Sequence, residues 1–340
     1  MRSKVLIIYT GGTIGMMQDA TSGQLVPFDF KHLTQQIPEL KKFDIDLSSV
    51  SFKRPIDSSD MQPEIWIELA KMIEGHYNEV DGFVILHGSD TMSFTASALS
   101  FMLENLNKPV ILTGSQLPIG TIRTDGKENL ITAIEIAAAK TKGRPIISEV
   151  CIYFESQLYR GNRTHKFNSE QFQAFQSANY PILAEAGVHI KYNSNALQKP
   201  SRKKLKVHTN LNADIVILKL FPGINSNVVN AILQINNIRA VILETFGSGN
   251  CTTEPWFINA LKDAISRGII ILNVTQCNAG DVEQGKYATS AKLITAGVIS
   301  GNDITTEAAV AKLMYLLGMK NNKGIMKKLL LANLRGEISV

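Results

Sequence analysis

Apolar residues recur along the chain with two different spacings. Short, continuous runs rich in Val and Ile are typical of strands that are buried on both faces of a parallel sheet. Longer segments with apolar residues three to four positions apart are typical of amphipathic helices. Because the two kinds of segment alternate, the first half of the chain favours a doubly wound α/β fold with a mostly parallel sheet. The predicted strands are residues 4–9, 81–88, 108–114 and 149–154, and the predicted helices are residues 63–77, 95–106 and 125–140.

The pattern changes near residue 191. Residues 191–212 are polar and basic without clear periodicity, so we predict a linker there. The alternating pattern then resumes, which predicts a larger N-terminal α/β domain at 1–190 and a smaller C-terminal α/β domain at 213–340. The C-terminal elements are strands 214–221, 239–246 and 268–277, and helices 225–235, 253–268 and 305–318.

The composition is that of an ordinary globular protein. With 44% hydrophobic residues in a chain of 340, there is ample material for a core. The net charge of +5 comes partly from residues 199–208, which we interpret as a solvated stretch and not as a nucleic-acid surface. The apolar run at 5–8 is too short for a signal peptide, and no apolar stretch is long enough to span a membrane.

The spacing of cysteines and histidines bears on compartment and cofactors. Cys151, Cys251 and Cys277 form no CxxC pair, which suits free thiols in a reducing compartment. The six histidines show no HxxxH or HxH pairing, so the sequence predicts no dedicated metal site. We therefore expect a cytoplasmic protein.

Polar loops follow the predicted strands of the first domain. In open parallel sheets, ligands bind beyond the carboxyl ends of the strands. The first loop, GGTIG, lacks the spacing of a dinucleotide-binding or phosphate-binding loop, and its alternative interpretation is a tight exit from the strand. Glycines in such loops let a ligand approach the backbone. The loop residues are 10–15, 87–91, 113–116, Glu155 and 160–166.

Three residue types in these loops suggest chemistry. Ser89 and Asp90 follow the second strand, where the alternative is a cap for the next helix. Lys166 near Asp90 would have its pKa lowered by burial and act as a base, whereas the alternative is a solvent-exposed lysine. We interpret His87 as a packed histidine. Together with Thr13 on the first loop, these residues predict a hydroxyl nucleophile with a proton relay.

Several motifs carry a resemblance to a known family. In this order and spacing, the chain resembles the bacterial-type L-asparaginases of the type I, cytoplasmic branch over essentially its whole length. The resemblance implies an amidohydrolase that converts L-asparagine and water to L-aspartate and ammonia, with no metal ion and no organic cofactor. The motifs are TGGTIGM (10–16), DSSDM (57–61), HGSDTM (87–92), TGSQLP (113–118), RGNRTHK (160–166), FGSGN (246–250), TQCNAGDVEQGKYATS (275–290) and TTEAAVAKLMYLLG (305–318).

The resemblance assigns the catalytic residues. Thr13 matches the nucleophilic threonine, which forms an acyl-enzyme that water then hydrolyses. Ser89, Asp90 and Lys166 match a hydroxyl–carboxylate–lysine relay. The family usually has threonine where this chain has Ser89, so the hydroxyl is kept but the methyl group that restricts its rotamer is lost. We expect retained chemistry with looser positioning of this hydroxyl.

The resemblance also assigns substrate-binding residues. Asp57, Ser58, Ser59 and Asp90 match the residues that hold the α-amino and α-carboxylate groups of the substrate, and Ser115 is a further predicted contact. Such a charged grip fits a free amino acid better than a peptide. The alternative for residues 57–60 is a simple turn, since Asp and Ser are common there.

One tyrosine of many relatives is missing from this chain. The mobile first loop, residues 16–28, has no tyrosine, and Leu25 or its neighbours occupy that region. Tyr315 matches a tyrosine in some type I relatives that also lack the loop tyrosine. Its two interpretations are a catalytic residue and a packed helix residue.

Type I relatives also bind a second asparagine and respond cooperatively. Thr275 and Cys277 match that second site, whereas His165, a bulkier residue, stands where relatives commonly have threonine. The family assembles as intimate dimers, often paired into tetramers, and two-fold closure is common for soluble oligomers.

Three alternatives stay open. The first is an enzyme that uses glutamine equally well, since one methylene in a pocket discriminates by only about 1–3 kcal/mol. The second is an amidotransferase subunit, whose N-terminal extension we do not expect here because the chain begins at its first strand. The third is a catalytically silent amino-acid sensor, which Thr13, Asp90 and Lys166 disfavour and Ser89 leaves open.

Overall fold

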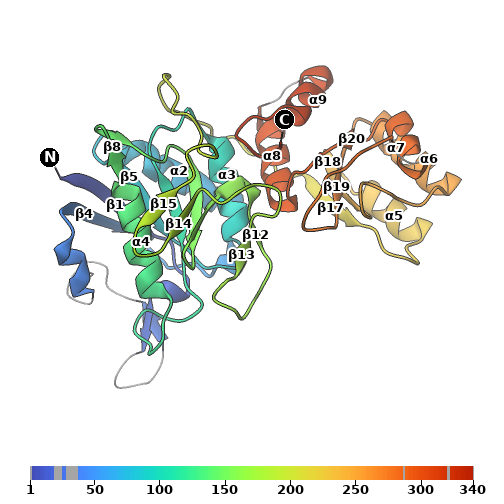
Figure 1. Ribbon diagram of the computed structural model, residues 1–340. Coiled ribbons are helices and arrows are strands. Elements are labelled where there is room, and N and C mark those ends of the chain that lie inside the picture. Colours follow the sequence, from blue (N-terminus) through green and yellow to red (C-terminus); the bar gives the residue numbers. More distant parts are fainter. Residues whose placement is uncertain (1, 19–24, 28–36, 286–287, 320–321, 340) are drawn as a thin grey trace. The chain divides into compact units, whose positions relative to one another are not determined.

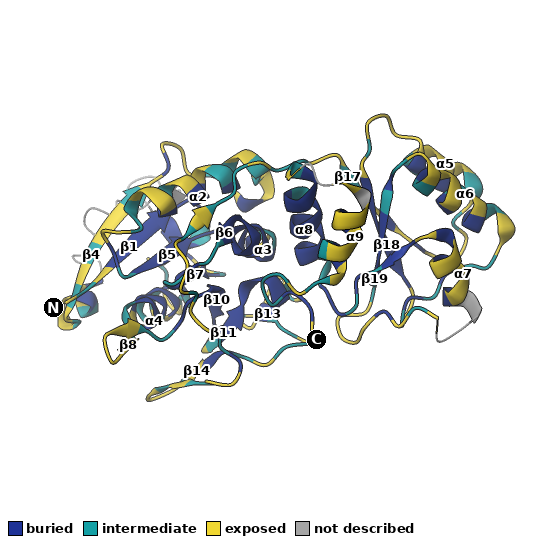
Figure 2. Ribbon diagram, turned by 90° about the horizontal axis from the view of Figure 1, so that it is seen from above, coloured by how far each residue is buried: buried dark blue, intermediate teal, exposed yellow. Residues whose placement is uncertain are grey.

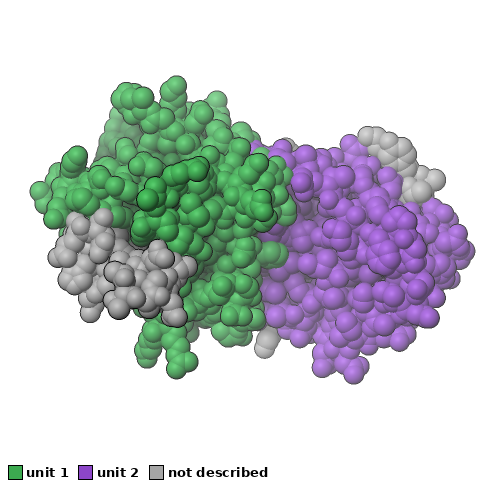
Figure 3. Space-filling model, turned by 90° about the horizontal axis from the view of Figure 1, so that it is seen from below, with its two compact units in different colours: residues 1–177, 181–209 green, residues 178–180, 210–340 purple. Residues whose placement is uncertain are grey.

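The computed structural model describes residues 2–18, 25–27, 37–285, 288–319 and 322–339 (Figure 1). The chain divides into two compact units (Figure 3). The first unit comprises residues 1–177 and 181–209, and the second comprises residues 178–180 and 210–340. Among the described residues, no helix combines the length and the apolar character needed to cross a membrane.

An eight-stranded sheet forms the centre of the first unit. The strand order is β15-β14-β11-β10-β7-β5-β1-β4, in which β4, β1, β5, β7 and β10 run parallel and β11, β14 and β15 are antiparallel. The predicted fold class, a doubly wound and mostly parallel sheet, is therefore confirmed. The bounds are β1 Ser3–Tyr9, β4 Ile45–Ser51, β5 Gly82–Leu86, β7 Val110–Thr113, β10 Val150–Phe154, β11 Gln157–Arg160, β14 Ala184–Ala186 and β15 Ile190–Tyr192.

Helices cover both faces of this sheet. Helix α4 (Gly126–Ala138) packs on one face, against β1, β5 and β7, while α2 (Pro63–His76) and α3 (Met92–Met102) lie on the other face (Figure 2). Every residue of β5 and β10 is buried, which explains why these strands are continuous apolar runs. The sheet thus presents its polar loops at the carboxyl ends of the parallel strands.

One predicted helix differs from the observed one. The sequence predicts a helix over residues 95–106, but α3 spans Met92–Met102. It ends early because Leu103–Glu104 forms a short strand, β6, that pairs with β16 (Lys206–Val207). This pairing also attaches part of the predicted linker to the first unit. The division into a catalytic domain and a smaller domain at the predicted boundaries stays our proposal.

Short two-stranded β-sheets and 3-10 turns connect the main elements of the first unit. They supply the loops around the carboxyl edge of the sheet. The remaining strands are β2 Met16–Gln18, β3 Leu25–Pro27, β8 Lys140–Thr141, β9 Arg144–Pro145, β12 His165–Lys166 and β13 Phe175–Gln176, and the 3-10 turns are η1 Thr13–Gly15, η3 Pro38–Lys42, η4 Ser58–Asp60 and η5 Gly161–Arg163.

The second unit contains a four-stranded parallel sheet of order β17-β18-β19-β20. Helix α8 begins within one residue of the predicted start, and its N-cap is Thr305, whose hydroxyl accepts from the Ala308 amide. It ends at Gly318, where an added Cβ would lie 2.0 Å from the Asn210 carbonyl oxygen. The bounds are β17 Ile215–Lys219, β18 Ala240–Thr245, β19 Ile270–Thr275, β20 Ile299–Ser300, α5 Ser226–Leu233, α6 Pro255–Ser266, α7 Ala288–Ala296, α8 Thr306–Gly318 and α9 Lys323–Leu331.

Candidate active site

The loop after β1 carries Thr13 on the first residue of η1. Two glycines before it adopt φ values of +134° at Gly11 and +85° at Gly12, where L side chains are strained. A Cβ on Gly11 would lie 2.1 Å from the Ile56 carbonyl oxygen, and one on Gly12 would lie 2.4 Å from the Gly88 amide nitrogen. The glycines therefore let this loop pack directly on the backbones of two neighbouring loops.

These three loops enclose a cavity of about 220 Å³. They follow β1, β4 and β5, which are adjacent in the sheet and end at the same edge. The cavity is small and both polar and charged groups face it, so it suits a small polar ligand. The residues that line it are Gly12, Thr13, Met16, Pro55, Ile56, Asp57, Ser58, Gly88, Ser89 and Asp90.

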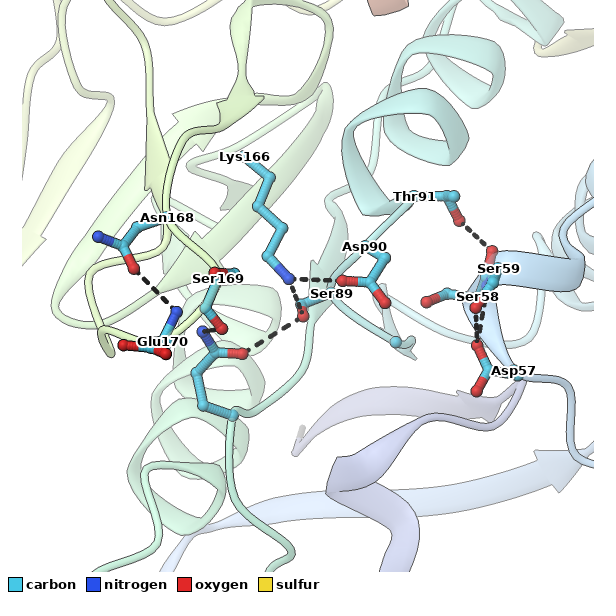
Figure 4. Close-up of polar contacts among 12 residues, drawn as sticks. Asp57, Ser58, Ser59, Ser89, Asp90, Thr91, Lys166, Asn168, Ser169 and Glu170 are labelled. Atoms are coloured by element: carbon cyan, nitrogen blue, oxygen red, sulfur yellow. Dashed lines mark hydrogen bonds and ion pairs between the residues drawn. The ribbon is translucent and has the colours of Figure 1, made fainter.

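Lys166 reaches this cavity edge from a different part of the chain. It lies on β12, which pairs with β13, and its side chain is only 14% exposed. Its Nζ lies 2.8 Å from Ser89 Oγ and 2.7 Å from Asp90 Oδ1 (Figure 4). Asp90 is 64% exposed, so this ion pair is partly solvated on the carboxylate side. The structure thus brings the predicted hydroxyl, carboxylate and lysine into direct contact.

The alternative in which Ser89 and Asp90 cap the next helix does not match the observed geometry. The N-cap residue of α3 is Thr91, and no side chain accepts a capping hydrogen bond there. The Thr91 hydroxyl instead donates to the Ser58 carbonyl oxygen at 2.7 Å, joining two of the cavity loops (Figure 4).

The segment 57–59 forms both a turn and part of the cavity wall. Asp57 is the N-cap of η4, and its Oδ1 accepts from the amide of Ser59 at 2.8 Å and from its hydroxyl at 2.5 Å (Figure 4). These hydrogen bonds lower the pKa of the Asp57 carboxyl, so it is an anion at neutral pH. Asp57 and the buried Ser58 line the cavity, whereas Ser59 orients Asp57 from outside it.

His87 is buried, and its ring connects the loop after β5 to helix α3 through hydrogen bonds. Its Nε2 lies 2.9 Å from Thr95 Oγ1, which in turn accepts from the Trp66 indole at 3.0 Å. The Gly88 carbonyl oxygen can only accept, so Nδ1 carries the proton and donates to it at 2.6 Å. In the neutral ring Nε2 then accepts from the Thr95 hydroxyl. Burial lowers the pKa of His87 to about 4, which keeps the ring neutral.

Two residues of the TGSQLP motif differ in their placement. Ser115 is buried and donates to the Leu117 carbonyl oxygen at 2.6 Å, and it does not line the cavity. Gln116 was not predicted as a site residue, yet its Oε1 lies 3.5 Å from Ser89 Oγ. Its Nε2 donates to the carbonyl oxygens of Ser169 and Gln171 at 3.2 and 3.0 Å, which fixes the amide orientation. The position of Gln116 directly after strand β7 is the feature of the sequence that could have identified it as a site residue.

The remaining predicted residues are spread over both units. His165 precedes Lys166 on β12. In the second unit, Tyr315 is buried in α8, and Thr275 ends β19 with its hydroxyl donating to the Gly247 carbonyl oxygen at 2.6 Å. Cys277 is an exposed free thiol whose amide donates to Thr275 Oγ1. In the first loop, residues 19–24 and 28 lie outside the described residues, including most of the segment where relatives carry a tyrosine.

No metal-binding cluster occurs in the described part of the chain. Its His, Cys, Asp and Glu side chains form no group of three or more that could hold an ion. The absence of a cofactor stays a prediction.

The fold and the cavity define an α/β enzyme whose polar residues meet at the carboxyl edge of a parallel sheet. The family models that match are "Asparaginase, N-terminal" over residues 4–198 and "Glutaminase/Asparaginase C-terminal domain" over residues 214–330. The chain therefore belongs to the asparaginase family and is an amidohydrolase of that family, which confirms the resemblance read from its motifs.

Individual relatives agree with this assignment. L-asparaginase 1 of Escherichia coli (strain K12) is 42% identical over 342 residues, which cover 99% of this chain and 98% of that protein. The crystal structure of L-asparaginase I from Vibrio cholerae O1 biovar eltor matches with a TM-score of 0.90 and 40% identity over 100% of both chains. The 60 kDa lysophospholipase of Mus musculus is 41% identical over 99% of this chain, which spans 63% of that longer protein.

Proposed function

We propose that this protein hydrolyses L-asparagine to L-aspartate and ammonia, with Thr13 as the nucleophile. The observation that carries the proposal is the contact of Lys166 with Ser89 and Asp90 at the rim of the cavity that Thr13 lines. The names of the Escherichia coli and Vibrio cholerae relatives, which match along their whole length, support the substrate.

The cavity favours a free amino acid. Two carboxylates, Asp57 and Asp90, face it and would pair with the α-amino group of the substrate. Ser58 and the glycine amides of the loops offer hydrogen bonds for the α-carboxylate. A volume of about 220 Å³ has room for one small amino acid and little more.

The proposed reaction passes through an acyl-enzyme. Thr13 Oγ attacks the side-chain amide carbon, and its proton leaves through the hydroxyl–lysine relay. The tetrahedral intermediate collapses, the C–N bond breaks, and the nitrogen takes up a proton to leave as ammonia. Water, deprotonated through Ser89 and Lys166, then attacks the ester and releases aspartate. The Ser89–Lys166 distance of 2.8 Å suits proton transfer in either direction.

The proposal also includes a group that activates the Thr13 hydroxyl. Tyr315 would assist this proton transfer in place of the tyrosine that the first loop lacks. We test this by Tyr315→Phe, and unchanged turnover in a folded protein would exclude the catalytic role.

We further propose that the protein acts in the cytoplasm as a homodimer or homotetramer. In this proposal a second asparagine activates the enzyme through the region of Thr275, Cys277 and His165.

The decisive experiment is ammonia release over a wide range of L-asparagine, with L-glutamine in parallel. Thr13→Ala should lower turnover by about 10³-fold or more, because removal of a nucleophile leaves only binding and electrostatic effects. Thr295→Ala, at an exposed helix position, is the matched control and should leave the rate unchanged. Release that persists in Thr13→Ala would overturn the assigned nucleophile.

A sensor is the second candidate, and Ser89 in the usual threonine position is the observation that favours it. A folded wild-type protein that binds asparagine in calorimetry but releases no ammonia would establish this alternative. Equal rates with glutamine would instead indicate a broader amidase.

A further inference from the structure

Tyr9 lies directly beneath the turn that carries Thr13. It is the last residue of β1 and is buried. Its hydroxyl donates to the Gly15 carbonyl oxygen at 3.2 Å. Burial raises the pKa of Tyr9 to about 12, so at neutral pH the hydroxyl keeps its proton and acts as a donor.

Gly15 is a glycine for reasons of space. A Cβ at this position would lie 2.1 and 2.3 Å from two carbon atoms of the Tyr9 ring and 2.5 Å from its hydroxyl oxygen. Gly15 does not have a positive φ, in contrast to Gly11 and Gly12, so its backbone does not require a glycine. The Tyr9 ring therefore occupies the space that a side chain at position 15 would need.

Gly15 in turn closes the Thr13 turn. Its amide donates to the Gly12 carbonyl oxygen at 3.2 Å, and the next amide, that of Met16, donates to the Thr13 carbonyl oxygen. On the opposite side, Gly12 packs on the Gly88 backbone. The turn is thus held between the loop after β5 and the Tyr9 ring.

We propose that Tyr9 is a positioning residue for Thr13, which it fixes through the ring contact and the hydrogen bond to Gly15. This inference rests on the proposed function, in which Thr13 Oγ attacks the substrate. A displacement of about 1 Å at a reacting group can lower a rate by about 10²-fold, so a rigid support under this turn has a direct effect on turnover.

Two single variants and their combination test the proposal. Gly15→Ala should lower kcat by about 30-fold or more, because the new methyl group must displace the ring or the turn. Tyr9→Ala should also lower kcat, through loss of the support. The double variant should be more active than Gly15→Ala alone, because the methyl group then occupies space that the ring has left. Tyr9→Phe, which removes only the hydrogen bond, should lower kcat by about 3- to 10-fold.

The binding of L-aspartate, the unreactive product, distinguishes a displaced Thr13 from a binding site that is disrupted as a whole. Its dissociation constant should change by less than about threefold in the folded variants, because Asp57 and Asp90 carry the binding charge. Gly75→Ala is the matched control, since a Cβ on this exposed helix residue meets nothing within 4 Å. Thermal unfolding of every variant verifies that the native fold persists.

The outcomes distinguish this inference from the proposed function. Wild-type kcat in Gly15→Ala would overturn the positioning role, as would a double variant whose loss equals the product of the two single losses. An active Thr13→Ala variant would instead overturn the assignment of the nucleophile itself.

Discussion

At the scale of single residues, Ser89 shows how contacts can replace a lost methyl group. A threonine is limited in its χ1 rotamers by its branched Cβ, whereas a serine is free to rotate. In this protein the Ser89 hydroxyl lies 2.8 Å from Lys166 Nζ and 3.5 Å from Gln116 Oε1. The Gln116 amide is itself fixed by two backbone carbonyls. These contacts favour one orientation of the hydroxyl without the methyl group.

Ser89→Thr should therefore keep turnover within about threefold of the wild type, because the hydroxyl and its partners are retained. Ser89→Ala should lower turnover by about 10²-fold, since the relay loses its oxygen. Steady-state ammonia release measures both. A large fall in Ser89→Thr, with the fold intact, would contradict retained chemistry at this position.

His87 makes stability depend on pH. Its pKa is about 4 in the folded protein, against 6.5 for the free side chain, so the unfolded chain binds a proton that the native state does not. The contribution is complete above pH 6.5 and is lost as the pH falls toward 4. From the pKa difference, we expect the free energy of unfolding to fall by about 2 to 3 kcal/mol from this residue between pH 7 and 4.5.

Urea unfolding of the wild type and His87→Gln at pH 7 and 4.5 measures this contribution of His87 to the free energy of unfolding. The variant should be less stable at pH 7 but should lose less stability on acidification than the wild type. His189→Gln, at an exposed position in a loop, is the control and should follow the wild type. Parallel curves for the wild type and His87→Gln would show that His87 does not titrate as described.

At the scale of elements, the sequence predicts β1, β5, β7 and β10 and most of the helices, because these buried strands are continuous apolar runs. The sequence does not predict the parallel strand β4, whose residues alternate between partly buried and exposed, or the helices α7 and α9. It misses β12 and β13, which have two residues each and no periodicity. For the same reason, it places Lys166 in a loop but cannot give the distance to Ser89. The end of α3 is also unpredictable locally, because β6 pairs with residues about 100 positions later. Gly15 looks like any loop glycine until the Tyr9 ring is seen beside it.

Helix α8 illustrates a contact that no local pattern reveals. Lys312 Nζ lies 2.6 Å from Glu337 Oε1, and both side chains have no exposed surface. The lysine also donates to the carbonyl oxygens of Leu330 and Ala332. Glu337 accepts from the amides of Leu334 and Arg335, so the buried charges are paired and fully hydrogen-bonded. This pair fastens the C-terminal segment to α8.

Lys312→Met should lower the free energy of unfolding by about 3–5 kcal/mol, because it leaves Glu337 buried without its partner. Adding Glu337→Gln should restore part of this loss, since the second variant removes the unpaired charge. Denaturant unfolding at pH 7 measures both. If the double variant is no more stable than Lys312→Met alone, the loss comes from packing and not from charge.

At the scale of the whole molecule, each unit carries a sheet whose parallel strands have polar residues at their carboxyl edge, but the two edges are organised differently. In the first unit, Ser89, Asp90 and Thr13 face a cavity. In the second unit, the Thr245 hydroxyl donates to Asn273 Oδ1 at 2.7 Å, and Gln276 Nε2 donates to two backbone carbonyls. Polar groups of the second edge thus hold the loops around Thr275 in place through hydrogen bonds within the unit.

Regulation by a second asparagine predicts a sigmoidal rate curve for the wild type. A ligand that binds one state of an oligomer better shifts the population toward that state, with a coupling free energy of typically about 1–3 kcal/mol. Thr275→Val removes the hydroxyl that joins the Gly247 carbonyl and the Cys277 amide, so the curve should become closer to hyperbolic. Thr295→Ala should keep the wild-type shape. Sedimentation of each variant shows whether the assembly has changed, and a hyperbolic wild-type curve over a wide asparagine range would exclude this form of control.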